Sequence, residues 1–165
     1  AGAMTLIHMA TQQPARIEAM ILISGTPYIS STGRKDLQPA DSMKPQDYEW
    51  LRKYATHGDD QIRSLWNQLY KLKDNFEAMN FTPPYLSTIK ATTLIVHGDR
   101  DRLFPVERAL ELYRSIPHSY LWVIPNADHG PIDKHPDVSR ISRASPSPSP
   151  AARAMCSGVI SSPAS

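Results

Sequence analysis

The sequence is poor in the features that mark several protein classes. Its 165 residues include one cysteine, Cys156, so there is no internal disulfide and no sign of a disulfide-built secreted scaffold. No apolar run approaches the roughly 18 residues that a membrane-spanning helix needs. The formal net charge is only +2, too small to favour a nucleic acid or a membrane surface as partner. These features favour a cytoplasmic globular protein.

Two separate stretches alternate between helix and strand. Residues 3–11 are apolar on nearly all sides, which predicts a helix buried beside a sheet, and residues 19–24 form a short apolar run typical of a parallel strand. The second stretch predicts a strand over 92–98, a helix over 106–116 and a strand over 120–126. This order is typical of a right-handed crossover in a parallel sheet, so we expect an α/β fold.

The remaining segments have a different character. Residues 28–90 are polar and helical in pattern, with helices expected over 45–58 and 59–79. Apolar residues at helical three/four spacing give the second of these helices one apolar stripe. The stripe comprises Ile62, Leu65, Trp66, Leu69, Leu72 and Phe76. Residues 139–165 are rich in serine and proline and keep no hydrophobic period, so we expect a disordered tail.

Polar side chains follow two neighbouring strands of the expected sheet. Asp99 and Asp101 follow the strand that ends at His97-Gly98, and Asp128 and His129 follow the next strand. The carboxyl ends of parallel strands are where ligands bind, and they bring such loops together. An Asp that orients a His through its Nδ1 proton leaves Nε2 as a base, as in hydrolytic triads. Salt bridging of the acids by Arg100 and Arg102, or a metal site from His97, Asp99, Asp101 and His129, are alternative interpretations.

These residues also carry a family resemblance. The segment TLIVHGDRDRLFPVERALELYRSIPHSYLWVIPNADHGP closely resembles the C-terminal part of α/β-hydrolases, in their esterase, lactonase and carbon–carbon-bond hydrolase branch. In that family the strand ends in G-x-x-D, which matches Asp101, and the histidine loop has the form P-x-(G/A)-(G/D)-H, which matches His129. The resemblance, over roughly residues 1–138, implies that Asp101 and His129 are the acid and base of a catalytic triad.

The family's nucleophile motif, G-x-S-x-G, does not occur in this sequence. The opening AGAMTLIHMA instead resembles the continuation of that motif into its helix, with Gly2 as the last glycine. The resemblance implies that the nucleophile would lie immediately before Ala1 and that the Ala1 amide would donate to the oxyanion. A serine there implies an esterase-like enzyme, and an aspartate a dehalogenase or epoxide hydrolase. Ser24 ends a strand without such a turn, so we assign it no role.

The resemblance divides the chain into four parts. Residues 1–27 and 87–138 would form the hydrolase core, 28–86 an inserted helical cap, and 139–165 a tail that departs from the family. In the cap, Trp50, Trp66 and Leu69 would contact an apolar part of a small-molecule substrate. The chemistry implies no cofactor and no metal, and exposed sheet edges would favour self-association. The alternative is a non-catalytic binding domain, or an inactive fragment from a partial or frame-shifted gene.

Overall fold

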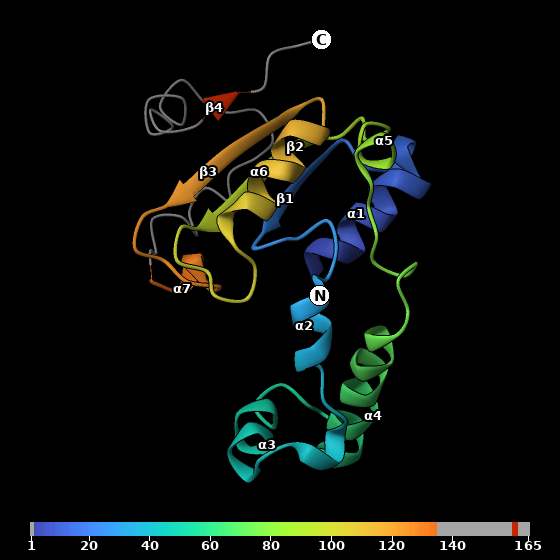
Figure 1. The fold of residues 1–165 in the computed structure, drawn as a ribbon, viewed down its shortest axis with the longest axis vertical. Helices are drawn as coiled ribbons and strands as arrows, with labels where there is room; N and C mark the ends of the chain where they lie inside the picture. Colours follow the sequence, from blue (N-terminus) through green and yellow to red (C-terminus); the bar gives the residue numbers. More distant parts are fainter. Residues whose placement is uncertain (1, 135–159, 162–165) are drawn as a thin grey trace. The chain divides into compact units, whose positions relative to one another are not determined.

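The computed structural model describes residues 2–134 and 160–161, and these form two compact units. Among the described residues, the first unit is built from 2–27, 81–134 and 160–161, and the second from 28–80. Each is described by itself below, with the element labels of Figure 1.

The first unit is a four-stranded sheet with helices packed against it (Figure 1). Its strands lie in the order β1 (Ala19–Ile23), β2 (Thr92–Gly98), β3 (Ser119–Ile124) and β4 (Ile160–Ser161). The first three are parallel, and β4 pairs antiparallel with β3. The helices are α1 (Gly2–Gln12), the 3₁₀ turn η1 (Pro14–Arg16), α5 (Pro83–Leu86), α6 (Val106–Ser115) and α7 (Pro131–Lys134). The expected parallel α/β sheet is therefore confirmed.

Alternation along the strands divides the apolar residues between the two faces of the sheet. On one face a buried cluster joins strand residues to α1, α5 and α6. It comprises Ile7, Ala10, Met20, Leu22, Phe81, Leu86, Ile89, Ala91, Ile95, Ala109, Leu112, Tyr113, Ile116 and Leu121. A smaller cluster of Val96, Ile124 and Ala127 occupies the other face, with Ile132 of α7 packed against it. This double burial explains the continuous apolar runs of β2 and β3.

The second unit is a group of short helices. They are α2 (Ser31–Asp36), η2 (Ala40–Ser42), α3 (Pro45–Leu51), α4 (Gly58–Tyr70) and η3 (Lys71–Lys73). The Ser30 hydroxyl caps α2 by accepting a hydrogen bond from the Gly33 amide at 3.0 Å. Arg34 is buried and donates to the carbonyl groups of Leu72 and Asn75, while its guanidinium lies 4.2 Å from the centre of the Phe76 ring. These contacts tie α2 to the chain that follows α4.

Four details differ from the sequence-based expectations. The helix expected over 45–58 ends at Leu51, and Gly58 begins α4 instead of ending that helix. The helix expected over 59–79 ends at Tyr70, because the following segment turns to meet Arg34. Residues 81–86 belong to the first unit, since Phe81 and Leu86 are buried in its core. In the tail, Ile160 and Ser161 form β4, which pairs with β3, and the other residues of 139–165 lie outside the described part.

A membrane-spanning helix is not found within the described residues, because none of their helices is both long and apolar enough.

Candidate active site

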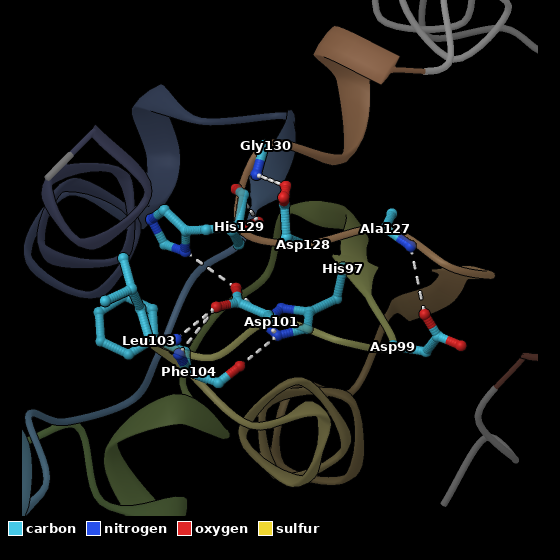
Figure 2. Close-up of polar contacts among 10 residues, drawn as sticks. His97, Asp99, Asp101, Leu103, Phe104, Ala127, Asp128, His129 and Gly130 are labelled. Carbon is cyan, nitrogen blue, oxygen red and sulfur yellow. Dashed lines mark hydrogen bonds and ion pairs between the residues drawn. The ribbon is translucent and has the colours of Figure 1, made fainter.

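Asp101 is held rigidly just after β2. Its side chain is fully buried, and its Oδ1 atom accepts hydrogen bonds from the backbone amides of Leu103 at 2.8 Å and Phe104 at 2.9 Å (Figure 2). An Asp that accepts from amides two and three residues ahead stabilises a tight turn. The turn therefore leaves Oδ2 free to meet a second partner.

That partner is His129, which follows β3. Its Nδ1 atom lies 2.8 Å from Oδ2 of Asp101, as Figure 2 shows. Because a carboxylate only accepts, Nδ1 of His129 carries the proton, and Nε2 of the neutral ring keeps its lone pair. The His129 side chain is 43% exposed, whereas that of Asp101 is 0% exposed. The pair thus joins a buried orienting carboxylate to an accessible base.

The two loops that carry this pair are bound closely together. The Arg100 amide donates to the Ala127 carbonyl at 2.9 Å, and the Ala127 amide donates to Oδ1 of Asp99 at 3.3 Å. A Cβ atom on Gly98 would lie 2.3 Å from the Ala127 carbonyl oxygen and 2.4 Å from that of Asp128. No larger residue fits there without displacing backbone. Gly98 therefore permits the approach on which the Asp–His pair depends.

Ser24 also holds His129, although the sequence analysis gave it no role. Its hydroxyl donates to the His129 carbonyl oxygen at 2.8 Å. Ser24 is buried and has a φ of 48°, in the left-handed region that non-glycine residues seldom adopt. The available signal was its place at the carboxyl end of β1, which pairs with β2. A backbone acceptor, however, leaves no trace in the sequence.

A pocket of about 350 Å³ opens beside His129. Its lining comes from the start of α1, the end of β1 and the two loops, and combines apolar side chains with polar atoms. The lining residues are Gly2, Ala3, Met4, Leu6, Ile21, Ile23, Ser24, Phe104 and His129. This volume is at the lower end of the range for small-molecule sites.

The four residues considered as metal ligands do not form a metal site. Among residues 2–134 and 160–161, no group of three or more His, Cys, Asp or Glu side chains is placed to hold an ion. Asp99 instead accepts from the Ala127 amide, and the His97 ring is fully buried with Nε2 2.8 Å from the Phe104 carbonyl oxygen.

The other predicted site residues lie outside the first unit or outside the described residues. Trp50, Trp66 and Leu69 belong to the second unit. Trp50 is 59% exposed, with its ring 5.5 Å from that of Tyr54, and the Trp66 indole donates to the Gln38 carbonyl at 3.1 Å. Their assignment to substrate binding stays a prediction. Ala1, predicted as an oxyanion donor, lies outside the described residues.

Comparisons with known proteins agree with this architecture. The sequence is 32% identical over 97 residues to the 2-hydroxy-6-oxo-6-(2'-aminophenyl)hexa-2,4-dienoic acid hydrolase of Metapseudomonas resinovorans, over 59% of this chain and 33% of that protein. The structure is similar to that of 2-hydroxy-6-oxo-6-phenylhexa-2,4-dienoate hydrolase from Rhodococcus sp. strain RHA1. That match has a TM-score of 0.60 at 17% identity, over 87% of this chain and 62% of the other. No protein-family model matches the sequence.

A third similar structure is a serine hydrolase involved in carbazole degradation. It matches with a TM-score of 0.61 at 18% identity, over 86% of this chain and 58% of the other. The chain is a C-terminal part of the α/β-hydrolase fold. It spans a third of the length of the curated relative and less than two thirds of these solved hydrolases. In this α/β-hydrolase portion, Asp101 and His129 follow consecutive strands of the parallel sheet.

Proposed function

We propose that this chain supplies the orienting acid and the general base of a hydrolase that cleaves a small ester, lactone or related carbonyl compound. The observation that carries the proposal is the 2.8 Å contact between Nδ1 of His129 and buried Oδ2 of Asp101, beside a pocket with several apolar side chains. A hydrolytic triad needs a His that is oriented on one nitrogen and free on the other.

In this proposal the nucleophile is a serine in a segment that precedes Ala1. Nε2 of His129 takes the serine proton as the hydroxyl attacks the carbonyl carbon, and Asp101 stabilises the imidazolium that forms. The imidazolium then protonates the leaving group, and a water molecule repeats the sequence to release the acid. Backbone amides, that of Ala1 among them, would stabilise the oxyanion.

Two observations support a serine before Ala1. Gly2 and Ala3, at the start of α1, line the same pocket as His129, so a nucleophile just upstream would lie near the base. In addition, one of the similar structures is described as a serine hydrolase, which favours serine over the aspartate alternative.

The pocket suggests the kind of substrate. Met4, Leu6, Ile21, Ile23 and Phe104 give it an apolar wall, so we infer that the substrate carries an aryl or alkyl group next to the scissile carbonyl. The relatives that act on aminophenyl- and phenyl-hexadienoates have substrates of this kind. Residues 28–80 would act as a cap, with Trp50, Trp66 and Leu69 facing the substrate.

We infer that the protein needs no cofactor, because serine, histidine and backbone amides provide the whole reaction. We also propose a cytoplasmic location and self-association through the exposed edge of the sheet. Size-exclusion chromatography with light scattering tests the last point, and a strictly monomeric chain would contradict it.

The test of the function is a chain extended upstream to include the proposed nucleophile. Its hydrolysis of a p-nitrophenyl ester, an aryl lactone and a phenyl-substituted 2-hydroxy-6-oxo-dienoate is compared with that of the present chain. We expect hydrolysis of at least one compound by the extended chain, lost in His129→Ala and kept in His118→Ala, an exposed histidine away from the pocket. Activity that survives His129→Ala would refute the proposal.

A further inference from the structure

A second histidine lies behind the Asp–His pair and takes no part in the proposed reaction. His97 is in β2, and its side chain is 0% exposed. Its Nε2 atom lies 2.8 Å from the Phe104 carbonyl oxygen and 3.5 Å from Oδ2 of Asp101 (Figure 2). Because a carbonyl oxygen only accepts, Nε2 of His97 carries a proton and donates it to Phe104.

Phe104 connects this buried donor to both members of the pair. Its amide donates to Oδ1 of Asp101 at 2.9 Å, and its ring meets the His129 ring edge-on with the ring centres 5.3 Å apart. Its carbonyl is the group that His97 holds. A shift of the Phe104 backbone would therefore change both the hydrogen bonding of the Asp101 carboxylate and the packing of the His129 ring.

The environment of the other ring nitrogen, Nδ1, indicates that only Nε2 of His97 makes a stabilising contact. Within the part of the chain that the structure describes, buried Nδ1 has no hydrogen-bond partner. Leaving a polar atom buried and unpartnered is unfavourable, and a hydrocarbon side chain would avoid it. A histidine at this position therefore lowers stability relative to a hydrocarbon side chain, unless the hydrogen bond from Nε2 compensates.

We propose that His97 is a positioning residue for the catalytic pair. Its Nε2 proton fixes the Phe104 carbonyl and the turn after β2, and thereby holds Oδ2 of Asp101 where it can accept from Nδ1 of His129. The inference rests on the proposed function in that it takes Asp101 and His129 as the acting pair. Its test measures the hydrogen bond between Asp101 and His129 directly and does not require catalytic activity.

The experiment is long-range nitrogen–proton correlation NMR on the present chain with 15N-labelled histidine, at about pH 9, well above the ordinary histidine pKa of about 6.5. It reports which ring nitrogen of neutral His129 carries the proton, and that is set by the hydrogen bond the ring makes. In the unsubstituted chain we expect the Nδ1–H form to dominate. In His97→Phe we expect that form to be lost, with Nε2–H becoming the major species.

Two amide substitutions of His97 test whether the position of the hydrogen-bond donor matters, or only the polarity of the side chain. A Gln side chain at position 97 places its amide nitrogen near the position of His Nε2, whereas an Asn side chain is too short. We therefore expect His97→Gln to keep the Nδ1–H form of His129 and His97→Asn to lose it. This matched pair decides the question even if His97→Phe does not fold, and His118→Gln controls for the loss of an exposed histidine. Methyl signals of Ile95 and Leu121 report that the core is intact.

The outcomes distinguish the two proposals. If the unsubstituted chain lacks the Nδ1–H form of His129, the catalytic pair itself fails, and the role of His97 fails with it. If that form is present and persists unchanged in folded His97→Phe and His97→Asn, the pair stands and the positioning role is overturned. Equal loss in His97→Gln and His97→Asn also overturns it, because the reach of the donor would then not matter.

Discussion

The hydroxyl of Ser24 donates a hydrogen bond to the carbonyl oxygen of His129 at 2.8 Å, although 105 positions separate the two residues in the sequence. The bond joins the end of β1 to the loop that presents the base. It does so from a backbone conformation, with φ at 48°, that is strained for any residue with a Cβ atom. The strained backbone of Ser24, at a place where its hydroxyl fixes the loop of His129, is consistent with a functional role for this position.

Ser24→Ala removes this bond and keeps the strain. We expect a loss of about 1 kcal/mol in the free energy of unfolding, measured by urea denaturation, because a buried carbonyl loses its donor. Ser24→Gly removes the same bond but relieves the strained φ, so it should cost less than Ser24→Ala. Equal stability of Ser24→Ala and the unsubstituted chain would show that the bond does not matter.

Gly98→Ala should drive apart the two loops that carry Asp101 and His129. The added methyl group meets the carbonyl oxygens of Ala127 and Asp128 at 2.3 and 2.4 Å, and backbone atoms cannot rotate away. We expect a destabilisation of about 1–3 kcal/mol in urea unfolding, the usual cost of inserting a methyl group into a packed site. Gly2→Ala is the matched control, since a Cβ there meets no atom of the described residues within 4 Å. If both substitutions are tolerated equally, the close approach of the loops is wrong.

An ion pair between α3 and α4 predicts a dependence of stability on pH. The Arg52 side chain makes two hydrogen bonds of 2.7 Å to Asp59, and these, with its charge, lower the pKa of that carboxyl below the usual value. A depressed pKa contributes stability above the unfolded value of about 3.9, and the contribution is lost as the pH falls through the folded value.

Arg52→Gln should therefore give a small loss of stability at neutral pH that vanishes in acid. The loss should also shrink at high salt, because both side chains are largely exposed. Lys53→Gln, the neighbouring exposed cation, is the control for a change of net charge. Thermal unfolding followed at neutral pH and near pH 2 measures the effect, and a loss that persists in acid would contradict the electrostatic explanation.

Trp50 provides a test of the proposed cap. Because its side chain is 59% exposed, Trp50→Ala should change the unfolding midpoint little. If Trp50 contacts substrate, the same change should raise KM for a phenyl-bearing substrate in the extended, active chain several-fold, and leave KM for an acetyl ester nearly unchanged. Tyr54→Ala alters the neighbouring exposed ring and is the matched control. Equal effects on both substrates would argue against a role in selectivity.

Much of the fold could be predicted from the sequence, because the strands of a parallel sheet are marked by unbroken apolar runs. Residues 92–98 form β2 as predicted, and β3, predicted over 120–126, begins one residue earlier and ends two residues earlier. The approach of Asp101 to His129 was predictable because both residues follow neighbouring parallel strands. In each case the local sequence pattern, an apolar run or a polar residue at a strand end, matches the position that the residue takes in the folded sheet.

The features that the sequence did not reveal depend on contacts between distant residues. The roles of Ser24 and His97 rest on backbone carbonyl acceptors, which every residue possesses and no motif records. In the sequence Gly98 looks like an ordinary strand end. Only the structure shows that a Cβ atom there would lie 2.3 Å from the Ala127 carbonyl oxygen. The end of α4 at Tyr70 likewise depends on Arg34, far earlier in the chain.

The central claim is that Asp101 orients His129 for catalysis, and the most direct measurement is kcat/KM of Asp101→Asn in the extended chain. In serine proteases the corresponding change lowers kcat about 10⁴-fold, because the histidine is left in the wrong tautomer. We predict a loss of about 10³–10⁴-fold that falls mainly on kcat, with circular dichroism unchanged. A kcat/KM within about threefold of the unsubstituted enzyme would contradict the account.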